Sequence, residues 1–166
     1  MDKITEIIKA FKMSKHPEGG YFSEVFRSKE LHKKESLPSR YKSDRHHYSS
    51  IYFLLKKNNF SAFHKLKTDE IWHFYSGSRL LIYIIESKDK ITKIKLGSDH
   101  KSEDKFQALV KNGKWFAAEV EDNKSYSLVG CTLSPGFDFE DFELGNKKKL
   151  TKQFPKHKDI IDRLSR

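Results

Sequence analysis

The chain has 166 residues, of which 36% are hydrophobic and 13% aromatic, so it is long enough for one packed domain and too short for two ordinary ones. Its formal net charge is +10, its only cysteine is Cys131, and it has no apolar run of the roughly 18 to 20 residues that a membrane-spanning helix needs. These features exclude an intramolecular disulfide and a helical membrane span, and they predict a soluble, cytoplasmic protein with one domain over residues 1–166.

Residues 1–15 predict a short N-terminal helix. Asp2 is a suitable N-cap, and apolar residues follow it at helical spacing, at Ile4, Ile7, Ile8 and Phe11. The sequence His16-Pro17-Glu18-Gly19-Gly20 ends the helix. We expect the apolar stripe to pack on the body of the domain.

From Tyr21 onward, short β-rich runs separated by polar or glycine-containing turns predict an antiparallel sandwich or barrel over residues 21–144. No helical crossover interrupts these runs, so neighbouring strands are expected to pair as hairpins. The predicted strands are Tyr21 to Arg27, Ser50 to Leu55, Phe60 to Leu66, Glu70 to Ser76, Leu80 to Glu86, Ile91 to Leu96, Phe106 to Val110, Trp115 to Val120 and Tyr126 to Leu133.

Two further segments flank or interrupt these strands. The polar stretch from Ser28 to Tyr48 predicts a long loop outside the core that is able to order over a pocket mouth. Residues 146–166 predict two short helices separated near Pro155, which serve as packing or dimer elements. Lysines in this tail alternate with apolar residues as on an amphipathic helix, and no nucleic-acid-binding motif accompanies them, so nucleic acid is a disfavoured partner.

The residues with the most chemical potential are His64, Glu70 and His73, on two consecutive predicted strands. Because side chains alternate along a strand, His64 and Glu70 meet if both point into a barrel, whereas alternation from Glu70 sends His73 the other way. A carboxylate beside a neutral imidazole gives either a proton-transfer pair or part of a metal site. Each histidine alone is more often structural than functional.

The spacing of His64, Glu70 and Gly77 resembles the first sequence motif of the cupin superfamily. The strings HPEGGYFSEVFRS (16–28), SSIYFLL (49–55), DEIWHFYSG (69–77) and GCTLSPGFDFEDFEL (130–144) resemble the uncharacterised family-five type of cupin. This resemblance implies an all-β cupin fold, a jelly-roll antiparallel β-barrel with short N- and C-terminal helices. It also implies a homodimer.

The resemblance also bears on metal binding. Metal-binding cupins carry a second histidine two residues after the first, where this chain has Leu66, and another in the second motif, where it has Phe116. Only His64 and Glu70 remain, with His73 as a third ligand if a bulge turns it inward. Since transition metals usually need three or more protein ligands, we expect no resident cofactor, and a divalent metal is disfavoured.

The first functional hypothesis, implied by the resemblance, is a metal-independent epimerase or isomerase acting on a sugar or sugar nucleotide. Its candidate catalytic residues are His64, Glu70 and Tyr21. His64, polarised by Glu70, would remove a proton α to a carbonyl, and Tyr21 or Tyr52 would return one from the opposite face. The alternative is a module that binds a small polar or anionic metabolite without turning it over.

Under either hypothesis the pocket needs an apolar lining with a few polar groups. The candidate ligand-binding residues are His16, Glu18, Tyr52, Trp72, His73, Gln107, Phe116 and Asp138. Gly19 and Gly20 either let the backbone approach a ligand or form a tight turn. The aromatic and acidic segment 135–143 either closes over the pocket or covers a sheet edge, and we favour the second role for Phe137 and Phe139. Asp138 or Glu140 is a candidate to reach a ligand hydroxyl, although acidic loop residues are more often only solvated.

Overall fold

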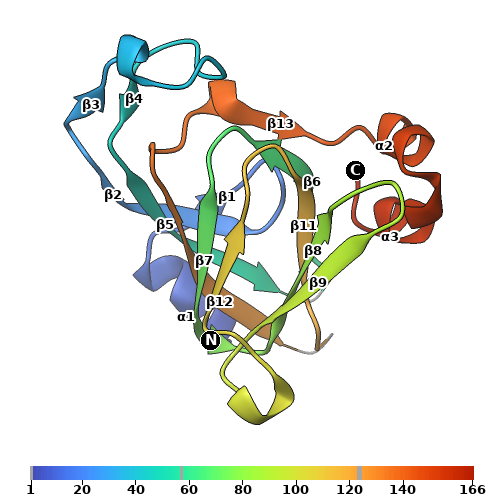
Figure 1. The fold of residues 1–166 in the computed structure, drawn as a ribbon. Helices are drawn as coiled ribbons and strands as arrows, with labels where there is room; N and C mark the ends of the chain where they lie inside the picture. Colours follow the sequence, from blue (N-terminus) through green and yellow to red (C-terminus); the bar gives the residue numbers. More distant parts are fainter. Residues whose placement is uncertain (1, 57, 123–124) are drawn as a thin grey trace.

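In the computed structural model, which describes residues 2–56, 58–122 and 125–166, two antiparallel β-sheets lie face to face with short helices at both ends of the chain (Figure 1). Met1 of the predicted helical segment lies outside the described residues. The six-stranded sheet has the order β1-β2-β5-β12-β7-β10, and the five-stranded sheet has the order β13-β6-β11-β8-β9. A third, two-stranded sheet pairs β3 with β4.

The strand bounds follow the predicted runs closely. The six-stranded sheet consists of β1 (Ser14–Lys15), β2 (Tyr21–Arg27), β5 (Ser49–Lys56), β12 (Tyr126–Leu133), β7 (Glu70–Gly77) and β10 (Gln107–Val110). The five-stranded sheet consists of β13 (Phe142–Leu144), β6 (Phe60–Leu66), β11 (Trp115–Val120), β8 (Leu80–Ile85) and β9 (Ile91–Leu96). Each predicted strand is present with bounds shifted by no more than one residue, and the all-β fold with short terminal helices is confirmed. The expected pairing of neighbouring strands as hairpins is wrong for most of the chain, because successive predicted strands other than β2–β5 and β8–β9 lie in different sheets. The short strands β1, β3 (Leu31–His32), β4 (Arg45–His46) and β13 were not predicted.

The main core lies between the two large sheets, where alternate side chains of both inner faces interdigitate. Phe53 and Trp72 come from the six-stranded sheet, and Ile82 and Phe116 come from the five-stranded sheet. Helix α1 (Lys3–Ala10) begins at Asp2, whose side chain accepts a hydrogen bond from the Thr5 amide at 3.1 Å, as predicted for the N-cap.

The terminal helices cover outer faces of the sheets. The isoleucines of α1 pack with Leu54 and Leu128 of the six-stranded sheet. At the other end of the chain, α2 (Lys147–Gln153) and α3 (Lys158–Arg163) are joined by a 3-10 turn, Pro155–His157. They pack Leu150 and Ile161 against Phe63 of β6. The predicted break near Pro155 is therefore confirmed. No helix in the described part of the chain is both long and apolar enough to cross a membrane.

The segment from Ser28 to Tyr48 departs from its prediction as a loop outside the core. It carries the β3–β4 pair and the 3-10 turn Lys34–Ser36, and Tyr41 and Arg45 are buried. The prediction failed because composition does not show that Arg45 has a buried partner, Asp141, far along the chain.

Candidate functional site

A cavity of about 210 Å³ lies between the inner faces of the two sheets. Its walls are largely apolar, and its polar side chains come from the turn before β2 and from strands β2, β5, β6, β7 and β12. The lining residues are His16, Glu18, Phe22, Glu24, Arg27, Ser49, Ile51, Phe53, His64, Leu66, Glu70, Cys131, Leu133, Phe137 and Phe139. This mixture of apolar walls and a few polar groups is typical of a small-molecule site.

Glu18 and His64 form a buried pair in this cavity. Oε2 of Glu18 lies 3.2 Å from Nε2 of His64, and Oε1 of Glu18 accepts a 2.7 Å hydrogen bond from the hydroxyl of Ser61. The turn that carries Glu18 is held against β6, because the Ala62 amide donates to the Glu18 carbonyl oxygen at 2.8 Å. The three residues that contact Glu18, namely Ser61, Ala62 and His64, therefore all lie within residues 61–64 of β6.

The hydrogen bonds of His64 fix its tautomer. Nδ1 lies 2.8 Å from the carbonyl oxygen of Ala62, and a carbonyl can only accept, so Nδ1 carries a hydrogen. When the ring is neutral, Nε2 is an acceptor and needs a donor. The carboxyl of Glu18 supplies that donor when it is protonated.

Burial favours this neutral form of the pair. Desolvation lowers the pKa of His64 to about 4. Desolvation also raises the pKa of Glu18, against the opposing influence of His16, Ser61 and Arg166. Both shifts favour a Glu18 carboxylic acid that donates to a neutral imidazole.

Glu70 is the second acidic group of the cavity. Its Oε2 accepts a 2.7 Å hydrogen bond from the indole nitrogen of Trp72. Desolvation, followed by repulsion from Glu18, raises the pKa of Glu70 to about 8, while hydrogen bonds from Trp72 and Cys131 oppose the shift. A carboxyl with this pKa is mostly protonated at pH 7 and still exchanges its proton near neutrality.

His16 completes the polar end of the cavity. Its Nδ1 accepts a 3.4 Å hydrogen bond from the Glu18 amide and lies 3.6 Å from Oε2 of Glu18. The ring packs edge-on against Phe22 at 4.8 Å between centroids. Burial lowers the pKa of His16, so the ring is neutral near pH 7 with its hydrogen on Nε2.

The structure places His64 and Glu70 in one cavity but does not pair them. The carboxyl beside the imidazole belongs to Glu18, whereas Glu70 bonds to Trp72. The expected direct contact between His64 and Glu70 is therefore wrong. The cause is the turn before β2, which inserts Glu18 next to His64.

The two tyrosines considered as proton donors lie outside this cavity. Tyr21 and Tyr52 pack with the cluster of Leu54 and Tyr126 beneath α1, on the outer face of the six-stranded sheet. Tyr52 also contacts Phe11, with ring centroids 4.7 Å apart. Strand alternation explains this placement, because Phe22 and Phe53 take the inward positions.

The other predicted ligand-binding residues divide between core and surface. Trp72 and Phe116 are buried in the core, and the ring of Phe116 lies 4.0 Å from that of His64. His73 lies on the outer face and bonds to Thr132 at 3.2 Å, as alternation from Glu70 predicts. Gln107 is exposed opposite His73. The side chain of Asp138 caps the turn at Glu140 rather than lining the cavity.

Phe137 and Phe139 line the cavity, so the favoured role of covering a sheet edge is wrong, and the segment takes the alternative place at the pocket. Their segment, residues 134–141, is fastened on both sides: Ser49 accepts a 2.8 Å hydrogen bond from the Phe137 amide, and Arg27 donates a 2.7 Å bond to the Phe137 carbonyl oxygen. We call this segment the aromatic strap.

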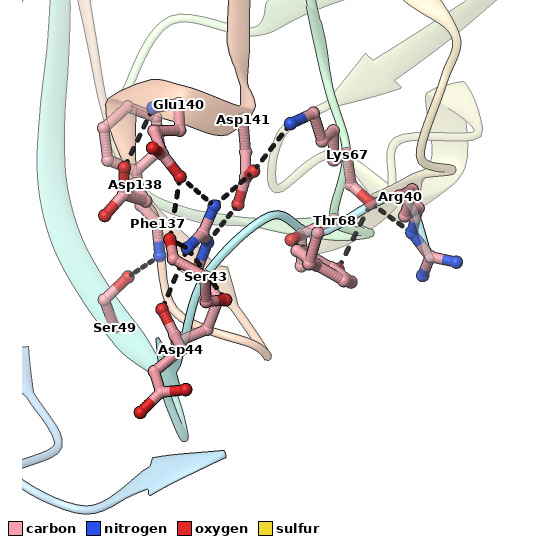
Figure 2. A network of polar contacts seen from close by, with 12 residues as sticks. Arg40, Ser43, Asp44, Ser49, Lys67, Thr68, Phe137, Asp138, Glu140 and Asp141 are labelled. Carbon is pink, nitrogen blue, oxygen red and sulfur yellow. Dashed lines mark hydrogen bonds and ion pairs between the residues drawn. The ribbon is translucent and has the colours of Figure 1, made fainter. Parts of the chain in front are cut away.

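A buried ion pair holds the end of the aromatic strap. Arg45 donates from Nε and Nη2 to both carboxylate oxygens of Asp141, at 2.6 and 2.8 Å, and the two side chains are only 1% and 3% exposed. Figure 2 shows that Asp141 also faces Lys67, and that Glu140 and Ser43 join the same network. The carboxylate of Glu140, a candidate for contact with a ligand hydroxyl, is instead bonded to Ser43 and Arg45 in this network.

The cavity does not fit a superfamily-type metal centre. Leu66 and Phe116 put apolar groups at two of the expected ligand positions, and His73 points away from His64 and Glu70. Within residues 2–56, 58–122 and 125–166, no group of three or more histidine, cysteine, aspartate or glutamate side chains is arranged to hold a metal ion.

Sequence reasoning missed three members of this site. Arg27 and Cys131 line the cavity without having been singled out, and Glu18 was expected only to bind ligand, not to pair with His64. Inward alternation from Leu133 gave a signal for Cys131, whereas Arg27 reaches the cavity through a register shift between Glu24 and Phe26 that alternation does not indicate. No local signal indicates the Glu18 contact, because it joins a turn to a strand some 40 residues away.

The comparisons with known proteins agree with this architecture. Residues 5–145 match the family model described as Cupin superfamily (DUF985). The crystal structure of protein SO0799 from Shewanella oneidensis is 38% identical, with a TM-score of 0.88 over 100% of this chain and 99% of that one. A hypothetical protein from Leishmania major is 30% identical, with a TM-score of 0.87 over 99% of both chains. The uncharacterised protein YML079W of Saccharomyces cerevisiae is 26% identical over 147 residues, which is 83% of this chain and 73% of that protein.

Proposed function

Because the chain belongs to the DUF985 family of the cupin superfamily, we propose that it binds a compact ligand between its sheets and moves protons on it, as an isomerase or epimerase does. The observation that carries this proposal is the presence of two proton carriers in one cavity. Glu70 is one, and the Glu18–His64 pair is the other.

The volume of the cavity limits the size of the ligand. The cavity has a volume of about 210 Å³. Sites for drug-sized ligands span about 300 to 1,000 Å³. A compact molecule such as a small sugar therefore suits the cavity better than a whole sugar nucleotide.

The charges around the cavity favour an uncharged ligand over an anion. Glu18 and Glu70 would repel an anion at the polar end when ionised, and Glu70 as an acid donates a hydrogen bond to a carbonyl or hydroxyl oxygen, whereas the proton of Glu18 is donated to His64. Arg27 is the cationic side chain of the lining, and Nε and Nη2 of its guanidinium already bond to Glu24 at 2.9 and 2.7 Å. The carbonyl and hydroxyl groups of a sugar match these donors.

The proposed chemistry needs one base and one acid on the same ligand. Glu70, whose pKa is about 8, has a carboxylate fraction near neutral pH that removes a proton α to a carbonyl. The Glu18–His64 pair holds one proton and returns it to the ligand. When that proton leaves, Glu18 becomes a carboxylate beside neutral His64, whose Nδ1 stays bonded to Ala62. The pair then takes up a proton from solvent and Glu70 releases the one that it gained, which restores both groups for the next turnover.

Solvent-exchange measurements test this proposal. Small aldoses, ketoses and hydroxyketones incubated with the protein in deuterated water are expected to gain deuterium next to the carbonyl, as followed by NMR. Glu70→Gln and Glu18→Gln should each slow exchange by about 10²- to 10⁴-fold. Glu143→Gln is the matched control, because Glu143 pairs with Lys65 outside the cavity.

The alternative function, binding without turnover, uses the same cavity. Compounds that raise the melting temperature but exchange no deuterium would favour a binding module over an isomerase. If no compact hydroxyl or carbonyl compound stabilised the protein, the ligand class itself would be wrong.

A homodimer and a cytoplasmic location also belong to the proposal. The support for self-association is a group of exposed apolar side chains on β7 and at the β10 edge of the six-stranded sheet, Ile71, Tyr75, Phe106 and Leu109. Sedimentation of the wild-type protein and of Leu109→Lys tests it. A monomer at high micromolar concentration would contradict self-association.

A further inference from the structure

A second pocket lies on the outer side of the turn that carries Glu18. Its volume is about 270 Å³, and it is lined by Lys15, His16, Gly19, Gly20, Tyr21, Asn59 and Arg166. His16 lines both this pocket and the cavity between the sheets, so the turn from His16 to Tyr21 separates two sites. We call it the turn pocket.

The turn pocket is cationic. Among the residues that the structure describes, Lys15 and Arg166 line it and no carboxylate side chain does. Neither cation forms an ion pair with any residue in the described part of the chain. A third cation, Lys56, lies 5.6 Å from the ring centroid of Tyr21. Lys65, by contrast, forms an ion pair with Glu143 on another part of the surface.

The geometry of the turn places the Arg166 guanidinium. Gly19 has φ +119°, and a Cβ there would collide with the Phe60 carbonyl oxygen and lie 2.6 Å from Nη2 of Arg166. The missing side chain therefore leaves the space in which the guanidinium lies, with its carbon 5.6 Å from the ring centroid of Phe60. Packing against a glycine and an aromatic ring orients this cation without consuming its donors.

Two neutral side chains add hydrogen-bonding groups. Oδ1 of Asn59 accepts a 3.3 Å hydrogen bond from the Gly20 amide, which leaves its Nδ2 to donate elsewhere. Tyr21, which cross-strand pairing puts opposite Lys15, brings a hydroxyl to the same pocket. Two cations, an amide and a phenol are the donor set that recognises a tetrahedral oxyanion.

We propose that the turn pocket binds the phosphate group of a small phosphorylated metabolite. A phosphate dianion matches the two unpaired cations in charge, and its oxygens offer acceptors to all the donors named above. This site is separate from the proton chemistry between the sheets and does not depend on it. It gives Tyr21 and the paired glycines a role that the cavity does not use.

The turn also couples the two sites electrostatically. Arg166 is one of the charges that act on Glu18, favouring the carboxylate and so lowering its pKa. A phosphate beside Arg166 would offset that charge. Binding in the turn pocket therefore favours the protonated form of Glu18 on the other side of the same turn.

Titration of the ¹⁵N-labelled protein with inorganic phosphate, at constant ionic strength, tests the site. Saturable shifts of the Gly19, Gly20 and Asn59 amide signals are expected. Lys15→Gln and Arg166→Gln should each weaken binding by about tenfold, the loss expected for one charge-assisted hydrogen bond. Both side chains are exposed, so neither variant is expected to unfold the protein.

Two comparisons make the test decisive. Lys93→Gln removes the same charge from an exposed position on β9, and it should leave phosphate affinity unchanged. Acetate should bind more weakly than phosphate. Shifts that never saturate, an equal loss in Lys93→Gln, or equal affinity for acetate would overturn the proposal.

Discussion

Oε2 of Glu18 lies 3.2 Å from Nε2 of His64, on a ring whose other nitrogen lies 2.8 Å from the carbonyl oxygen of Ala62. Since Nδ1 must donate to that carbonyl, the contact between Glu18 and His64 holds one proton. Charge on either residue is costly in this buried setting, so the proton stabilises both. The pair is thus part of the fold as well as of the site.

Substitutions at Glu18 should separate hydrogen bonding from acidity. In Glu18→Gln, the amide NH₂ donates to Nε2 of His64 and the amide oxygen accepts from Ser61, so we expect a loss below about 1 kcal/mol in the free energy of unfolding. Glu18→Ala leaves Nε2 of His64 and the hydroxyl of Ser61 buried and without a partner, and each unpaired group costs about 1–3 kcal/mol in the free energy of unfolding. Urea denaturation measures both values. Equal losses would contradict the proton-sharing geometry.

The raised pKa of Glu70 predicts a pH dependence of stability. The folded protein keeps the Glu70 proton up to about pH 8, whereas the unfolded chain releases it near 4.5. Between these values the native state binds more protons, so the free energy of unfolding falls as pH rises, by at most about 1.4 kcal/mol per pH unit. Glu70→Gln should remove the part of this slope that comes from Glu70 and be the more stable protein at pH 8.

The interval from pH 6.5 to 8 isolates Glu70 in the difference between wild type and Glu70→Gln, because Glu18, whose pKa burial also raises, contributes a slope of the same sign to both proteins. Below it, the lowered pKa of His64, about 4 against 6.5, acts in the opposite direction, because the unfolded chain then binds the additional proton. Urea midpoints across this interval, for wild type and Glu70→Gln, give the measurement. Parallel curves for the two proteins would show that Glu70 is not held as an acid.

Removing one partner of the Arg45–Asp141 ion pair should lower the free energy of unfolding strongly, whereas replacing both partners with apolar residues should lower it much less. Arg45→Met leaves the Asp141 carboxylate buried with only Lys67 nearby, and we expect a loss of about 3–5 kcal/mol. Arg45→Met combined with Asp141→Leu should recover much of that loss, because no unpaired charge remains. A double-mutant cycle from urea denaturation measures the coupling. Additive losses would mean that the pair does not hold the aromatic strap.

The sequence predicts those strands in which apolar and polar side chains alternate. The long strands follow from residues such as Ile82 and Phe116, whose apolar side chains recur at every second position. Short strands such as Arg45–His46 carry no such period. Their position depends on the contact between Arg45 and Asp141, which are 96 residues apart, and no local pattern encodes it.

The same distinction applies to the candidate site. Alternation correctly sends His73 outward and brings His64 and Glu70 to one cavity. It does not show that a turn residue, Glu18, takes the place beside His64. That contact depends on the path of the chain between Gly19 and Gly20, where positive φ angles turn it back along the sheet.

The aromatic strap should control access to the cavity, and Cys131 reports on it. Cys131 is a free, buried thiol in the cavity wall, and burial raises its pKa, so its reaction with iodoacetamide is slow. Phe139 lines the same cavity with 60% of its surface exposed. Phe139→Ala should therefore open the mouth and speed labelling of Cys131, at a cost below about 1 kcal/mol in stability.

Two controls distinguish an open mouth from a loosened fold. Phe106→Ala removes a ring that is 57% exposed and does not line the cavity, so it should leave the labelling rate unchanged. Phe116→Ala removes a ring that is 1% exposed and should lower the free energy of unfolding by about 3–5 kcal/mol. Cys131 in Phe116→Ala should react faster only because the protein unfolds more often, so the difference from wild type should disappear when rates are corrected for global unfolding. The faster labelling of Cys131 in Phe139→Ala should persist after the same correction. Equal rates in Phe139→Ala and Phe106→Ala would show that the aromatic strap does not limit entry.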